Sequence, residues 1–176
     1  MNFIRFSSLL VFIAVSVPAK AADETAPPNG VANFHSVKEI VDLVPRQTLM
    51  QLKIQSQMES ARTAANAALV QSAKDKWLTC KVKVVKWEPW DSPGVVPSKF
   101  RIDAQEQMMN INGVTFGARM MVYLGADAED VVTKLNKGAE VTVTSYLNRV
   151  DFTNNKGEGT KLNLDMTRTK IEAGTH

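Results

Sequence analysis

The chain has 176 residues and carries 21 lysine and arginine side chains against 18 aspartate and glutamate, for a formal net charge of +3. Its single cysteine and two histidines exclude an internal disulfide and a metal site built from clustered His and Cys. The length is sufficient for one domain with a substantial hydrophobic core, and we expect no cofactor.

Residues 1–21 have the pattern of a signal peptide. Arg5 is followed by a nine-residue apolar run over 9–17, and Ala19-Lys20-Ala21 predicts cleavage near Ala21/Ala22. The run is far shorter than the ~20 residues of a membrane span, so an uncleaved anchor is the less favoured alternative. We expect an exported protein, periplasmic or secreted, without a transmembrane anchor in the mature chain. Cleavage would lower the net charge to about +1, which weakens any case for nucleic acid.

Residues 22–35 contain Pro27-Pro28-Asn29-Gly30 and are predicted to be a flexible linker. Residues 36–75 are predicted to be an N-terminal helical segment. It begins with a Ser36–Glu39 capping box and a short helix that Pro45 ends. A long helix is expected from about Arg46 to Asp75.

One face of this long helix carries apolar residues at helical spacing, namely Met50, Ile54, Met58, Ala61, Ala65 and Ala68. This stripe either packs on the same domain or forms a partner face, with Met50, Ile54, Met58, Ala61 and Ala65 as the candidate contact residues. A partner face of this kind would allow a homo-oligomer.

Residues 77–87 alternate between apolar and polar side chains, as in a strand with one buried face. The alternation slips by one residue at Val84-Val85, which predicts a β-bulge. Cys80 lies on the apolar face and is predicted to be buried; a reactive or intermolecular thiol is the alternative. Residues 87–94 hold two prolines and a glycine and are expected to form a turn or loop.

The rest of the chain alternates in the same way. Strands are predicted at 99–104, 114–124, 141–147 and 162–166, the last extending toward 172, with turns at 110–113 and 154–159. A short helix is expected at 126–135, ended by Gly138. This order, with a helix between the third and fourth strands, is that of an OB-fold. We therefore expect a five-stranded OB-fold-like barrel over residues 76–172, preceded by the long helix and followed by a tail at 173–176.

The segment Leu135-Asn136-Lys137-Gly138-Ala139-Glu140-Val141-Thr142-Val143-Thr144 resembles a junction in exported OB-fold proteins of the tRNA-anticodon-binding-like type. In these proteins a short helix and Lys-Gly lead into a Val-x-Val strand. Ala65-Asn66-Ala67-Ala68, followed by Lys76-Trp77, is similar to the same group, so that the resemblance covers about residues 65–172. The glycine often found after the first strand is replaced here by Val85-Lys86-Trp87. The resemblance implies the fold and leaves the ligand open.

The sequence favours binding over catalysis. His35 lies in the predicted linker beside Ser36, His176 is the last residue, and the glycines form no phosphate loop. OB-folds bind through their second and third strands and the nearby loops, so we expect a ligand or partner face that includes Trp87, Trp90, Arg101, Arg119, Tyr123, Phe152 and Lys156. Alternatively, the two tryptophans cover the core and the arginines are paired or solvated.

The first hypothesis is thus a non-catalytic exported protein that binds a protein or an oligosaccharide in the cell envelope. A single-stranded nucleic-acid binder is the second hypothesis, which export and the low net charge make less favourable. An envelope hydrolase with two converging carboxylates is the third, because any two of the 18 acidic side chains could meet in the fold.

Overall fold

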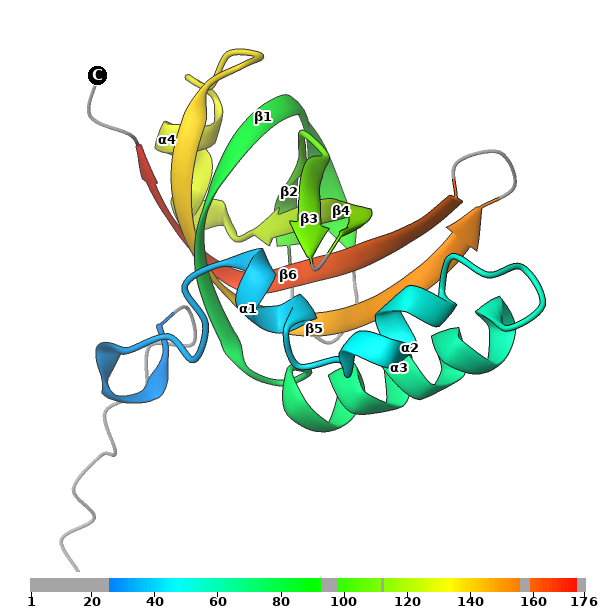
Figure 1. Cartoon of the computed structure of the whole chain (residues 1–176). Coiled ribbons are helices and arrows are strands. Elements are labelled where there is room, and N and C mark those ends of the chain that lie inside the picture. Colours follow the sequence, from blue (N-terminus) through cyan, green and yellow to red (C-terminus); the bar gives the residue numbers. More distant parts are fainter. Residues whose placement is uncertain (1–25, 93–97, 112, 156–158, 174–176) are drawn as a thin grey trace, which may run out of the picture.

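The computed structural model describes residues 26–92, 98–111, 113–155 and 159–173 (Figure 1). The predicted signal peptide with its cleavage point, Lys156 and residues 174–176 lie outside them. The helical elements are η1 (Pro28–Gly30), α1 (Val37–Val41), α2 (Arg46–Gln51), α3 (Met58–Ser72), η2 (Ala126–Ala128) and α4 (Glu129–Val132). The strands are β1 (Trp77–Ser92), β2 (Ser98–Ala104), β3 (Gln107–Ile111), β4 (Val114–Leu124), β5 (Glu140–Asn155) and β6 (Gly159–Ala173). Within these residues, no helix has both the length and the apolar character needed to cross a membrane.

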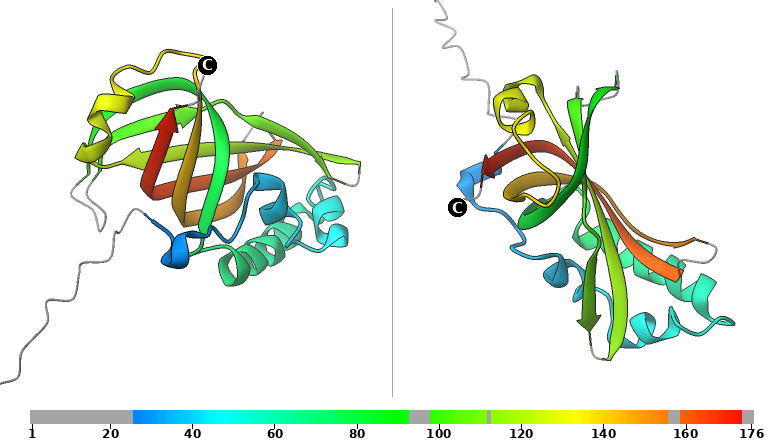
Figure 2. Two further views of the ribbon diagram at one scale, coloured as in Figure 1. Left: turned by 90° about the vertical axis from the view of Figure 1, so that its left-hand side faces the viewer. Right: turned by 90° about the horizontal axis from the view of Figure 1, so that it is seen from above.

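The six strands form one mixed sheet with the order β2-β1-β5-β6-β4-β3 and an additional pairing of β2 with β4. Hydrogen bonding therefore runs as a ring through β1, β2, β4, β6 and β5 and returns to β1, while β3 pairs with the first half of β4. The pairings between these strands are antiparallel except that of β4 with β6. Figure 2 shows α1, α2 and α3 toward one end of this ring of strands and α4 toward the other end.

The predicted bulge in β1 is confirmed. Val84 pairs with Ala104 and Lys86 with Asp103, which leaves Val85 as the extra residue. The strand does not end at residue 87, however, and the turn predicted at 87–94 was wrong over its first part. β1 continues to Ser92, and Pro89 pairs with Phe100. Beyond Val84, which bonds to Gly138 and Ala139, the ladder partner of the strand is β2, so the missing N–H of a proline can face away from the ladder.

The sequence also missed β3 and underestimated β5. β5 runs through residues 148–155 as one arm of a long hairpin with β6. Phe152, predicted to border a binding loop, is only 1% exposed and packs on Phe116 with ring centroids 5.5 Å apart. The aromatic side chain is drawn inward because Val150 and Phe152 share the core face of β5, so Phe152 is not part of an exposed binding face.

The predicted long helix is two helices with turns between Leu52 and Gln57. Leu49 in α2 and Leu52 just after it are buried, and so are Ala61, Ala65 and Leu69 in α3. In one continuous helix, Leu49 and Ala61 would be separated by about a third of a turn around the axis. The break lets both apolar faces meet the core, which a straight helix could not achieve.

α3 packs on the sheet of its own chain, next to β5. The Asn66 side chain accepts a hydrogen bond from the backbone N–H of Phe152 at 2.7 Å and donates one to its carbonyl at 3.1 Å. Ala61 and Ala65 are buried in the same core as the strands. The part of the stripe that lies on α3 therefore faces the protein's own sheet, while Met50 and Ile54 remain exposed.

The start of the described chain is attached to β1. Asn33 and Phe34, which the sequence assigned to a flexible linker, both donate backbone hydrogen bonds to the carbonyl of Trp77. The Asn33 side chain accepts from the N–H of Trp77, and Phe34 is buried. At α1 the predicted cap is confirmed, because the Ser36 side chain accepts from the N–H of Glu39 and the Glu39 carboxylate accepts from the N–H of His35.

Cys80 is buried on β1, as predicted. Burial raises the pKa of the Cys80 thiol to about 12, so that almost none of it is the nucleophilic thiolate near pH 8. We expect a thiol reagent such as DTNB to modify the folded protein at least about a hundredfold more slowly than the protein in denaturant. Absorbance of the released thionitrobenzoate measures both rates. Equal rates in the two conditions would contradict burial.

Candidate functional site

Trp87 has a structural role at the end of the sheet near α4. Its indole N–H donates to the carbonyl of Leu135 at 3.2 Å, and its ring lies edge-on to Phe100 with centroids 6.2 Å apart. The hydrogen bond holds β1 against the segment that follows α4, and the ring contact packs β1 on β2. Trp87 is thus separated from the other predicted site residues.

Trp90, Arg101 and Tyr123 come together on the outer side of the sheet. Strand register aligns Glu88 with Arg101 and Arg101 with Tyr123, so their side chains form a row across β1, β2 and β4. The rings of Trp90 and Tyr123 have centroids 5.9 Å apart at an interplanar angle of 58°. The Arg101 guanidinium lies over the Trp90 ring, 4.4 Å from its centroid, in a cation–π contact.

The cations in this row are paired with carboxylates. Arg101 lies 2.6 Å from Glu88 and 3.0 Å from Asp103, and Lys86 contacts the same two carboxylates at 3.1 and 3.3 Å. Hydrogen bonds to Glu88 and Asp103 raise the pKa of Lys86. These pairs match the alternative in which the arginine is neutralised within the protein, and they leave little free positive charge for a polyanion.

Tyr123 is the centre of a wider polar group. Its pKa is raised, first by burial and then by the charge of Asp165 on β6, with Arg101 opposing the shift. Asp165 is opposite Met121 on β4 and Arg149 on β5. Burial raises the pKa of Asp165, Arg149 lowers it, and Asp151 adds a smaller upward shift.

Two carboxylate oxygens in this group have no hydrogen-bond donor among the described residues. They are the Oδ1 atoms of Asp151 and Asp165, and both are buried. The other oxygen of Asp151 accepts a hydrogen bond from Arg149 at 2.8 Å. Both oxygens are almost without accessible surface, so a donor group reaches them only when neighbouring side chains move aside. Since a buried acceptor without a donor is costly, a donor that does reach them binds favourably. We name the set Trp90, Arg101, Tyr123, Arg149, Asp151 and Asp165 the Tyr123 face.

Arg119 belongs to a second ionic group, which lies nearer the start of β4 than Tyr123 does. Its Nε lies 3.9 Å from Glu106, whose carboxylate also lies 2.7 Å from Lys161 on β6. Gly117 leaves room for this arrangement, because a Cβ at residue 117 would overlap the Glu106 carboxylate. Arg119 is therefore engaged within the protein and lies apart from the aromatic pair.

The structure thus brings three of the predicted site residues together and separates the others. Arg149, Asp151 and Asp165 were missed. Asp165 follows Leu162-Asn163-Leu164, where alternation already places Asn163 and Asp165 on the face opposite the leucines. The shared outward face of Asn163 and Asp165 was the signal available in the sequence. Only the pairing of β6 with β4 places Asp165 beside Tyr123.

Within the residues that the structure describes, no group of three or more His, Cys, Asp or Glu side chains could hold a metal ion. No protein-family model matches the chain, and no curated protein matches it either. The candidate site must therefore be interpreted from its own chemistry.

Proposed function

We propose that this is a non-catalytic exported binding protein with an OB-fold barrel, and that it takes an oligosaccharide partner through the Tyr123 face. The ring of five strands, the parallel pairing of β4 with β6, and α4 between β4 and β5 support the barrel. The signal-peptide pattern of residues 1–21 supports export.

The observation that carries the proposal is the pair of buried acceptor oxygens of Asp151 and Asp165 in the same face as the Trp90–Tyr123 rings. A sugar ring is complementary to both the aromatic rings and the acceptor oxygens. Its C–H faces pack on aromatic rings, and its hydroxyl groups donate hydrogen bonds to carboxylates. The balanced charges of the face suit a ligand that is itself neutral and rich in hydroxyl groups.

A nucleic acid fits this face less well. Phosphate would approach the carboxylates of Glu88, Asp103 and Asp165, while Arg101 is already engaged by the first two. The expected mature charge of about +1 adds no long-range attraction. A protein could also donate to the two acceptors, but the adjacent Trp90 and Tyr123 rings favour the flat C–H face of a sugar, and the oligosaccharide is therefore preferred.

Replacing Trp90 by Ala is expected to weaken oligosaccharide binding by at least about tenfold, because truncation of a central tryptophan typically costs about 2 kcal/mol of binding free energy. The mature chain is screened on an array of neutral and amino-sugar oligosaccharides. The best ligand is then titrated by calorimetry into the wild type and the variant. Thermal melts establish that the variant is folded.

Met108→Ala is the matched control, because Met108 is an exposed apolar residue on β3 outside the Tyr123 face. It is expected to bind as the wild type does. Equal losses in both variants, or an array without any bound glycan, would refute the proposal. Binding of labelled single-stranded DNA or RNA at low salt would favour the nucleic-acid alternative instead.

The same titration also tests the hydrolase hypothesis. Asp165, with its raised pKa, and nearby Asp151 form a carboxylate pair of the general kind that glycosidases use. Mass spectrometry of the ligand after prolonged incubation is expected to show no cleavage. Cleavage products that disappear in Asp165→Asn would overturn the assignment as non-catalytic.

A further inference from the structure

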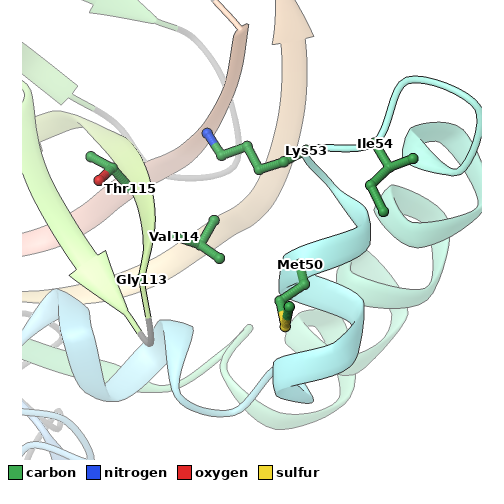
Figure 3. A pocket seen from close by; sticks show the side chains of 6 residues that line it. All are labelled: Met50, Lys53, Ile54, Gly113, Val114 and Thr115. Atoms are coloured by element: carbon green, nitrogen blue, oxygen red, sulfur yellow. The ribbon is translucent and has the colours of Figure 1, made fainter.

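A recess lies between α2 and the β3–β4 hairpin, apart from the Tyr123 face. It has a volume of about 500 Å³ and is lined by Met50, Lys53, Ile54, Gly113, Val114 and Thr115. Figure 3 shows side chains from the end of α2 and the turn after it on one side, and the start of β4 on the other. This volume lies within the range of small-molecule sites in proteins.

The lining of this recess is mainly apolar, and part of it is exposed to solvent. Met50 is 48% exposed and Ile54 is 45% exposed, although both are large apolar side chains. The break between α2 and α3 produces this exposure, because burial of Leu49 and Leu52 turns Met50 and Ile54 away from the core. Apolar residues grouped in a concave site are typical of a surface that binds an apolar group.

Lys53 is the one charged residue of the lining. Its ammonium group lies 4.7 Å from the centroid of the buried Phe116 ring, which holds the side chain across the recess. Among the described residues, no carboxylate lies within ion-pair distance of Lys53, so its positive charge is not neutralised inside the protein. Figure 3 shows the amino group directed toward the side where Thr115 lies, away from Met50.

We propose that this recess binds an amphiphilic carboxylate, with its alkyl chain against Met50, Ile54 and Val114 and its carboxylate on the Lys53 ammonium. The charge of Lys53 favours an anionic head group, and the apolar lining favours a hydrocarbon tail. The site does not depend on the function proposed for the Tyr123 face, since the two share no residue.

The test uses decanoate as the probe, with decanol and decyltrimethylammonium as uncharged and cationic analogues. Calorimetry on the mature chain, below the micelle concentration, is expected to show decanoate binding about fivefold tighter than decanol, with no binding of the cation. Lys53→Met is expected to remove the fivefold preference, and Lys53→Arg to retain it. Raising the salt concentration is expected to reduce the preference.

Ile54→Asp is expected to weaken decanoate binding by about tenfold, because it places a charge against the tail. Val70→Asp is its matched control, since Val70 is an exposed apolar residue on α3 outside the recess. Equal effects of the two changes, or unchanged selectivity in Lys53→Met, would overturn the proposal. A concentration-dependent dimer that Ile54→Asp dissociates, without decanoate binding, would overturn it in favour of a second copy of this chain.

Discussion

Phe152→Ala is expected to lower the free energy of unfolding by about 3–5 kcal/mol, the largest effect of any substitution considered. Phe152 is almost completely buried, contacts the ring of Phe116, and lies on β5 where α3 packs. Truncation removes the transfer free energy of the ring and leaves a cavity beneath the helix. Urea denaturation followed by circular dichroism measures the change.

The matched control for this experiment is Val70→Ala, which truncates an exposed apolar side chain of α3. It is expected to change stability by no more than about 0.5 kcal/mol. If Phe152→Ala changed the stability as little as Val70→Ala, Phe152 would have to lie at the surface. That is the position expected for the loop that the sequence predicted.

Asn66→Ala is expected to cost about 2 kcal/mol of stability. The change removes two hydrogen bonds to the backbone of Phe152, each worth about 0.5–1.5 kcal/mol, and leaves a partly buried N–H and carbonyl without partners. The higher helix propensity of alanine offsets about 0.5 kcal/mol of this loss. Chemical denaturation gives the size of the effect.

Hydrogen exchange shows where in the fold the Asn66→Ala change weakens the structure. In Asn66→Ala the amide of Phe152 is expected to lose protection while amides of β4 keep theirs, because only the contact between α3 and β5 is broken. Gln71→Ala, an exposed change on the same helix, serves as the control. Unchanged protection at Phe152 in Asn66→Ala would mean that α3 is held to the sheet by apolar packing alone.

Features governed by neighbouring residues could be predicted from the sequence. The Ser36–Glu39 cap depends on residues three positions apart, and the bulge at Val85 was visible as a slip in strand alternation. Gly138 has a φ of +89°, as its position after the short helix suggested. In each case the deciding contacts lie within a few residues of one another.

Features governed by distant residues could not be predicted in this way. The apolar spacing of Met50, Ile54 and Met58 suited one helix, but the core required Leu49 and Leu52 inward, so the helix is broken. Pro89 and its neighbours suggested a turn, but pairing with β2 extends the strand through them. Tertiary contacts outweighed local preference at both places.

The candidate site was predictable only in part for the same reason. Trp90, Arg101 and Tyr123 were predicted from the strands and loops that OB-folds use for binding, and the structure brings their side chains together. Asp165 joins them only because β6 pairs in parallel with β4, a contact between residues more than 40 positions apart. The alternation in the sequence places Asp165 on the outer face of its strand, but it does not show that Tyr123 lies nearby.

Chemical-shift mapping by NMR is the most direct test of oligosaccharide binding at the Tyr123 face. The isotope-labelled chain from residue 22 onward is titrated with the best glycan from the array. The largest changes are expected at the Trp90 indole N–H and at the amides of Tyr123 and Asp165. Changes confined to the recess lined by Met50 and Val114, or no saturable change at any amide, would contradict the proposed function.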